Sequence, residues 1–104
     1  MTTFRVLDGA GHRLDEIYEY TRRTWGDAQA DAYVRGIFEK FKAIAARDFP
    51  WRPIPAEFDV EGFFCRHQKH FIYWKLLADG KVGIVTVLHE RMHQIERLKD
   101  GLRF

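Results

Sequence analysis

Apolar residues recur with the period of an α-helix in two adjacent stretches of the chain. In residues 12–29 the positions along one side are Leu14, Ile17, Tyr18, Thr21 and Trp25. In the next stretch, which begins at Asp27, they are Ala30, Val34, Ile37, Phe41 and Ile44. Gly26 suits a left-handed cap after the first helix, Asp27 suits the N-cap of the second, and Pro50 ends it. Because so few residues separate the helices, the pattern predicts an antiparallel helical hairpin.

Strand patterns precede and follow this hairpin. Thr3 to Leu7 is a short alternating segment, which we expect to end in a turn at residues 8–11. β-Branched and aromatic residues fill three later segments, Gly62–Gln68, Phe71–Leu77 and Val82–Leu88. The resulting order, β-α-α-β-β-β, predicts an α+β fold in which a helical hairpin packs on one face of a small, mostly antiparallel sheet. We expect residues 1–104 to form one domain.

The last predicted strand carries apolar residues on both of its faces. Strict alternation places one set toward one face, namely Val82, Ile84, Thr86 and Leu88. It places the other set toward the opposite face, namely Gly83, Val85, Val87 and His89. The helices cover one face, so the other face also needs a cover. The proline-containing connector and the tail from Gln94 to Phe104 could supply it, but we favour a partner protein, alone or together with these segments.

The composition adds an excess of aromatic side chains to this picture. Aromatic residues make up 15% of the 104 residues, which is more than so small a core readily hides and favours a binding surface. The net charge of +2 is too mild to indicate direct DNA binding. A lone Cys65 and an N-terminus without an apolar signal region favour the cytoplasm, and no apolar run is long enough to predict a membrane span.

Five residues, His89-Glu90-Arg91-Met92-His93, match the H-E-x-x-H pattern of zinc peptidases. That chemistry needs both histidines on one helix, whereas here the motif follows a predicted strand. A second possibility is a metal site formed by several histidines on neighbouring strands, namely His67, His70, His89 and His93. We favour surface or partner contacts for these side chains and therefore predict no metal and no cofactor. Cys65 is interpreted as a small apolar filler of its strand.

Several stretches resemble the ParE toxins of type II toxin–antitoxin systems, within the RelE/ParE superfamily. They are LDEIYEYTRRTWG, QADAYVRGIFEKF, HFIYWKL and ADGKVGIVTVLHERM. The resemblance runs from about Leu14 to Met92, and it is specific at the first helix, at Trp25-Gly26 and at the LHxRM ending of the last strand. Many members have Asp after that Met, where this chain has His93, so the role of His93 stays open.

The resemblance implies a protein that acts by binding and is not an enzyme. Such toxins are held inactive by a ParD-like antitoxin, and members are understood to poison DNA gyrase. One alternative is the activity of the RelE branch, cleavage of mRNA on the ribosome, for which Arg66, Lys69, Arg91 and the histidines could supply acid–base and charge-stabilising groups. Another alternative is a non-toxic interaction module.

Two sets of candidate site residues follow. We expect the antitoxin to contact apolar side chains that the toxin's own core leaves uncovered, namely Tyr18, Trp25, Tyr33, Phe38, Tyr73 and Trp74. We expect the strand ends and the segment after them to carry toxicity through Arg66, His89, Arg91, Met92 and His93. No catalytic residue is predicted.

Overall fold

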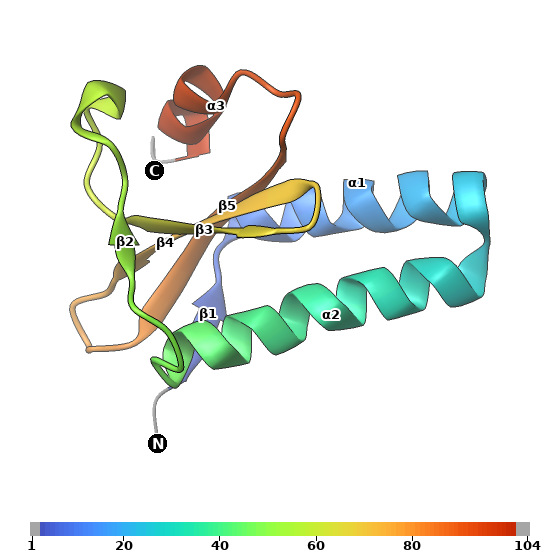
Figure 1. Ribbon diagram of the computed structural model, residues 1–104, viewed down its shortest axis with the longest axis horizontal. Helices are drawn as coiled ribbons and strands as arrows, with labels where there is room; N and C mark the ends of the chain where they lie inside the picture. The colour runs from blue at the N-terminus through green and yellow to red at the C-terminus, as the bar shows by residue number, and fades with distance from the viewer. Residues whose placement is uncertain (1–2, 102–104) are drawn as a thin grey trace.

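The computed structural model describes residues 3–101 as a sheet covered on both faces (Figure 1). The helices are α1 (Asp8–Trp25), α2 (Asp27–Ala45) and α3 (Gln94–Gly101), with a short 3-10 turn, η1 (Ala56–Phe58). The strands are β1 (Phe4–Val6), β2 (Arg52–Pro53), β3 (Phe63–His67), β4 (His70–Leu76) and β5 (Val82–His89). Their order in the sheet is β1-β5-β4-β3-β2. The predicted α+β fold is confirmed, and β2, η1 and α3 are additions to it.

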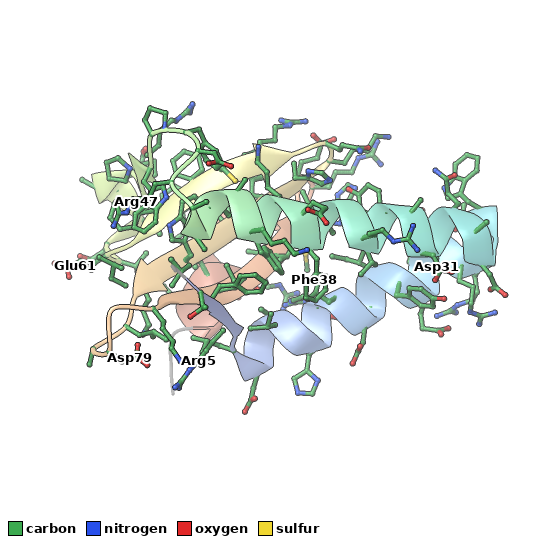
Figure 2. The ribbon with its side chains drawn as sticks, turned by 90° about the horizontal axis from the view of Figure 1, so that it is seen from below. Arg5, Asp31, Phe38, Arg47, Glu61 and Asp79 are labelled. Carbon is green, nitrogen blue, oxygen red and sulfur yellow. The ribbon has the colours of Figure 1, made fainter. Side chains whose placement is uncertain are left out.

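Among the strand pairs within residues 3–101, only β1 and β5 run parallel, and the other pairs are antiparallel. Leu7 continues the β1–β5 contact by donating its backbone N–H to the carbonyl of Ile84. An ion pair between Arg5 and Asp79 also joins β1 to the β4–β5 turn, with 3.3 Å between Nη2 and Oδ2, and these side chains point toward one another in Figure 2. The chain therefore enters the sheet at one edge before it turns into α1.

α1 begins at Asp8, so the turn predicted at residues 8–11 is wrong. The carboxylate of Asp8 lies in the first turn of the helix, where the helix dipole favours negative charge. Gly9 packs against the sheet, where a Cβ would stand 3.4 Å from the carbonyl oxygen of Val85. A Cβ at Gly11 would meet no atom within 4 Å, so packing does not call for glycine there.

Gly26 makes the sharp connection between α1 and α2, with φ of 95°. Its backbone N–H bonds the carbonyl of Arg22, so it closes α1, and it is also the residue before α2. Asp27 is the first residue of α2 and not its predicted N-cap. α2 ends at Ala45, well before Pro50, and Arg47 takes a positive φ of 56° just beyond that end.

The helical hairpin packs on one face of the sheet and extends beyond it. The buried residues between the two layers are Ala10, Leu14, Ile37, Phe41, Ile44, Ala45, Ile72, Trp74, Val82, Ile84 and Val87. Figures 1 and 2 show the outer halves of α1 and α2 reaching past the strands, with Asp31 on that outer part. We call this outer part, residues 18–31, the hairpin arm.

β5 contains a bulge at Val85, which strict alternation could not predict. The register passes from Tyr73 opposite Thr86 to Trp74 opposite Ile84, so Val85 is an extra residue. Before the bulge, Val82 and Ile84 face the helices; beyond it, Val87 does. The predicted grouping of Thr86 and Leu88 with Val82 is therefore wrong, because each step beyond the bulge is shifted by one residue.

The second face of the sheet is covered by the chain itself. The buried residues there are Ile54, Tyr73, Val85, Leu88 and Leu98. Leu98 of α3 is fully buried, and Phe58 of η1 packs against the same cluster. The expectation that this face is open in the free chain is wrong, because the connector and α3 cover it. The predicted tail extended to Phe104, and its residues 102–104 lie outside the described part of the chain. Additional cover by a partner protein stays a prediction. Within residues 3–101, no helix combines the length and apolar character needed to cross a bilayer.

Candidate functional site

The hairpin arm exposes aromatic side chains that the core does not use. Trp25 is 71% exposed at the end of α1. Tyr18 lies seven residues earlier on the same side of the helix, is half-buried, and donates a hydrogen bond to Asp31 of α2 at 2.9 Å. That bond raises the pKa of Tyr18 and helps hold the two helices together. Two of the residues predicted to be uncovered are therefore available on one side of the arm.

The arm also exposes Tyr20, which the sequence interpretation did not select. Tyr20 is 68% exposed and lies outside the apolar stripe of α1, about 200° around the helix from Tyr18. A large aromatic ring on the polar side of an amphipathic helix was the signal that could have identified it. Trp25 and Tyr20 thus form a pair of similarly exposed rings on different sides of one helix.

Phe38 and Tyr33 lie closer to the sheet than the arm does. Phe38 is partly buried against Phe4 and Phe41, with ring centroids 6.5 Å and 5.2 Å away. Tyr33 is partly buried against histidines of the sheet. Both side chains keep some exposed surface, so they border the core instead of standing free of it.

Tyr73 and Trp74 are buried, which contradicts the expectation that the core leaves them uncovered. Tyr73 is 2% exposed and belongs to the second face, where its ring stacks on Phe64 with centroids 6.3 Å apart. Trp74 is 0% exposed under the helices, against Trp51 and Phe63. β4 lies in the middle of the sheet, with layers on both sides, so large rings at adjacent positions are both enclosed.

Four rings gather where α2 crosses the ends of β3, β4 and β5. Register places His67 opposite His70, and His70 opposite His89. The His70 and His89 rings are perpendicular, with centroids 5.2 Å apart. Tyr33 joins them from α2, with its hydroxyl 2.6 Å from Nδ1 of His70. We call Tyr33, His67, His70 and His89 the histidine cluster.

Burial shifts the pKa of His70, of His67 and of Tyr33 in this cluster. It lowers the pKa of His70 to about 4, with smaller contributions in the same direction from His89 and His67 and an opposing one from Glu90. Burial also lowers the pKa of His67, aided by Lys40, and raises that of Tyr33. We assign the phenol as the donor because it stays protonated, which leaves the ring proton of His70 on Nε2. His70 is then neutral at pH 7 and already engaged, so it is poorly suited to acid–base catalysis there.

The H-E-x-x-H match does not have the geometry of a zinc peptidase. His89 is the last residue of β5, and Glu90, Arg91 and Met92 form a turn before α3. The predicted break between the two histidines is confirmed. His93 lies beyond the turn, with Nδ1 3.5 Å from Oε2 of Glu96. Within the described part of the chain, no three His, Cys, Asp or Glu side chains are grouped to hold a metal ion.

Cys65 packs against the helix-side core, as predicted for an apolar filler. Its burial raises the pKa of the thiol to about 11, so the thiol stays protonated at neutral pH. A protonated thiol is a poor nucleophile.

The predicted toxicity residues fall around the turn that follows β5. We call residues His89 to His93 the β5 ending. Arg91 and His93 are exposed, whereas Met92 packs partly into the second-face cluster. Arg66 of β3 reaches the ending through an ion pair with Glu90, and Glu90 also donates its backbone N–H to the carbonyl of Lys69 at 2.8 Å. The structure thus brings the selected residues of β3 and β5 to one end of the sheet.

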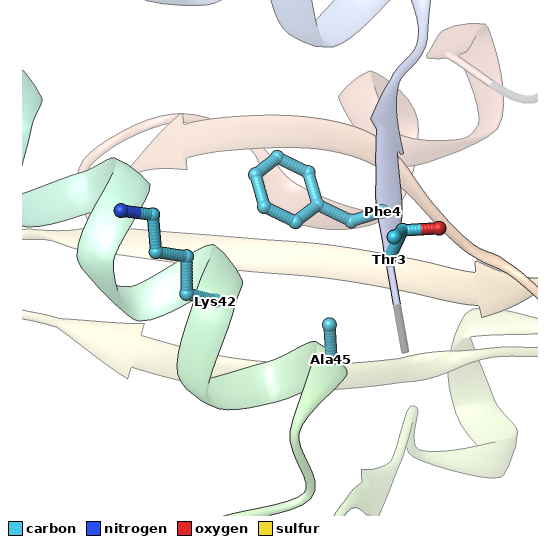
Figure 3. A pocket seen from close by; sticks show the side chains of 4 residues that line it. All are labelled: Thr3, Phe4, Lys42 and Ala45. Atoms are coloured by element: carbon cyan, nitrogen blue, oxygen red, sulfur yellow. The ribbon is translucent and has the colours of Figure 1, made fainter. Parts of the chain in front are cut away.

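A shallow hollow of about 300 Å³ lies elsewhere, beside β1 and the end of α2 (Figure 3). Its lining residues are Thr3, Phe4, Lys42 and Ala45. None of the predicted site residues lines it. Exposed rings and an exposed turn are features suited to contact with another macromolecule, whereas a small-molecule site is typically a deep, mostly apolar pocket.

Comparison with known proteins identifies the family. The model of the ParE toxin of the type II toxin–antitoxin system, parDE, matches residues 5–94, and the chain belongs to this family. Toxin ParE of Escherichia coli is 30% identical over 103 residues, covering 99% of both chains. Toxin ParE1 of Caulobacter vibrioides is 29% identical over 94 residues, covering 89% of this chain and 94% of the relative.

A solved structure shares the fold. It is described as the chromosomal ParDE TA system from P. aeruginosa, and its matching chain superposes with a TM-score of 0.69 at 18% identity. The match covers 86% of this chain and 96% of that chain. The two chains therefore share the arrangement of the helical hairpin and the sheet. Membership of the ParE toxin family rests on the sequence.

Proposed function

We propose that this toxin is neutralised by a ParD-like antitoxin and acts in the cytoplasm by inhibiting DNA gyrase, through binding and without bond breaking. The family match over residues 5–94 carries this proposal. The structure supports it with two separate contact surfaces. The hairpin arm offers exposed rings, and the β5 ending offers an exposed arginine on a tight turn.

The hairpin arm is the surface that we assign to the antitoxin. Tryptophan is enriched among residues that dominate binding energies, because its ring buries much area at little entropic cost. Trp25 is exposed, and Tyr18 stands on the same side with its orientation held by Asp31. Tyr33 and Phe38 extend this assignment along α2 with their exposed edges. Tyr73 and Trp74 are enclosed by the free chain and are dropped from it.

The test of the antitoxin surface compares two similarly exposed aromatic residues of α1, Trp25 and Tyr20. Trp25→Ala is expected to weaken antitoxin binding at least tenfold, because a tryptophan anchor costs about 2 kcal/mol or more when truncated. Tyr20→Ala, with 68% exposure on a different side of α1, is the matched control. Binding is measured by calorimetry with the purified antitoxin. Equal affinities for the two variants and the parent would remove the arm from the interface.

The β5 ending is the surface that we assign to the target. Arg91 is exposed in its turn, beyond the sheet, and a guanidinium offers several hydrogen-bond donors to an acidic or carbonyl-rich surface. Arg91→Ala is expected to abolish inhibition in a gyrase supercoiling assay while antitoxin binding persists. Arg97→Ala removes an exposed arginine from α3 and serves as the control. If Arg91→Ala inhibits gyrase as well as the parent, the ending is not the toxic surface.

The alternative function is ribosome-dependent cleavage of mRNA. The histidine cluster is the specific observation that favours it. Histidines, Arg66, Lys69 and Arg91 occur together at one end of the sheet. The low pKa and the occupied Nδ1 of His70 weigh against it, since an acid–base catalyst works best with a pKa near the working pH. Translating ribosomes with labelled mRNA test it directly. Cut mRNA would support the nuclease, and activity in neither assay would support a non-toxic interaction module.

A further inference from the structure

Gln94, the first residue of α3, joins the β5 ending to the centre of the sheet. Its side-chain Nε2 donates to the carbonyl of His89 at 2.8 Å and to the carbonyl of Met92 at 2.9 Å. Its Oε1 accepts the hydroxyl of Tyr73 at 2.8 Å. One partly buried amide therefore ties both sides of the turn around Arg91 to a residue of β4.

The anchor of this arrangement is rigid. Tyr73 is 2% exposed and stands in the middle strand, stacked on Phe64. Burial raises the pKa of its phenol to about 12, so it remains a hydrogen-bond donor at any physiological pH. The Gln94 amide is therefore bonded to a buried and closely packed side chain, that of Tyr73.

The chemistry of the site requires an amide. Nε2 supplies two N–H donors for two carbonyl oxygens, and Oε1 supplies the acceptor for the Tyr73 hydroxyl. A flipped amide would point Oε1 at both carbonyl oxygens, so the hydrogen bonds determine its orientation. A glutamate of the same shape keeps the acceptor but loses both donors and places negative charge against the two carbonyls.

The turn that Gln94 holds contains the residue assigned to the target. Within it, Met92 donates its backbone N–H to the carbonyl of His89 at 3.0 Å, and Arg91 donates its backbone N–H to Nδ1 of His89 at 3.1 Å. The His89 carbonyl thus accepts from both Met92 and Gln94. These bonds hold the backbone of the turn from which the exposed Arg91 side chain extends.

We propose that Gln94 is a positioning residue of the toxic surface: its amide, anchored on Tyr73, holds residues 89–93 in the one turn that presents Arg91 to the target. The inference rests on the proposed function, because it deepens the role given there to the β5 ending. Gln94 itself need not touch the target. Its effect is to fix the presenting turn before binding, so that the target does not have to order it.

The experiment compares Gln94→Glu with Lys99→Gln, an equal change of net charge at an exposed position of α3. Gln94→Glu is expected to raise the concentration for half-inhibition of gyrase supercoiling at least tenfold and to speed hydrogen exchange of the Arg91 and Met92 amides at least tenfold. Antitoxin affinity should stay within twofold of the parent, and Lys99→Gln should change none of these quantities. Tyr73→Phe, which removes one hydrogen bond and keeps the ring, should give a smaller change in the same direction.

Each outcome decides between the positioning role and its alternatives. Unchanged inhibition and exchange in Gln94→Glu would overturn the positioning role while Arg91→Ala still tests the ending. A large fall in melting temperature together with lost antitoxin binding would also overturn it, because Gln94 would then merely support the fold. If the parent does not inhibit gyrase, the proposed function fails, and the exchange measurement still decides whether Gln94 holds the turn.

Discussion

Leu98→Ala tests whether α3 covers the second face of the sheet through one buried side chain. Leu98 is 0% exposed and is the only residue in the described side chains of α3 that is fully buried. An eight-residue helix has little stability of its own, so packing must hold it in place. Removing the Leu98 side chain therefore removes the main hydrophobic contact of α3.

The expected loss of stability in Leu98→Ala follows from the burial of Leu98 and from the position of α3 after the last strand. Leu→Ala in a core costs about 2–5 kcal/mol, and the cost is lower where the surroundings can relax. α3 follows the last strand and is free to shift, so we expect the low end, about 2–3 kcal/mol. Since each 1.4 kcal/mol is a factor of ten, amides of α3 should exchange about 30- to 150-fold faster.

The assay is hydrogen exchange read by mass spectrometry or NMR. Exchange should rise in α3, while α2 amides, which contact other core residues, should keep their protection. Lys99→Ala changes an exposed neighbour on the same helix and is the control. Equal protection of α3 in Leu98→Ala and in the parent would refute the conclusion that this side chain holds the helix on the sheet.

Three further predictions concern other parts of the fold. Gly62→Ala should lower the free energy of unfolding by about 2 kcal/mol or more in urea titrations, because Gly62 has φ of 144° and a Cβ would stand 2.8 Å from the carbonyl oxygen of Trp74; Gly80→Ala, with φ of 85° but open space, should cost less. Trp51→Phe should cost about 1 kcal/mol, since Trp51 Nε1 donates to the carbonyl of Ile44 at 3.0 Å. The free energy of unfolding should fall as pH drops from about 6.5 to about 4, because the unfolded chain binds a proton at His70 that the folded chain does not. Partial solvent screening reduces this effect to about 1–2 kcal/mol. His70→Asn should flatten the dependence of the free energy of unfolding on pH.

Local patterns were sufficient for the helical hairpin and for the order of the main helices and strands along the chain, but not for the parallel pairing of β1 with β5. The stripe from Leu14 to Trp25 depends on neighbours three and four residues apart, which sequence displays directly. The start of α1 was missed because glycines at positions 9 and 11 are typical of turns, whereas in the fold Gly9 packs beside the carbonyl of Val85 within a helix. Contacts between layers decide such positions, and they are not visible along the chain.

Only part of the candidate site could be predicted, because contacts between layers also decide which of its residues meet and which are buried. Neighbouring strands were expected to bring His67, His70, His89 and His93 together. Antiparallel register aligns the first three, whereas His93 lies exposed beyond β5 and does not join them. Tyr33 joined this cluster from α2, a contact that depends on how the helix crosses the sheet. Burial of Tyr73 depends on the tail forming α3, so an apolar face that looked open in sequence is closed in the fold.

The extra residue at Val85 also affects how relatives of this chain are to be compared. Beyond it, His89 shares a face with its register partner His70 and so lies on the helix side. A relative that lacks one residue in β5 would align with a single gap. Each later side chain of its strand would then lie on the opposite face of the sheet from its aligned counterpart here. Its counterpart of His89 would then lie away from the helices, even with identical letters on both sides of the gap. Gap placement in this strand is therefore a better guide than percentage identity to whether two toxins present the same surface.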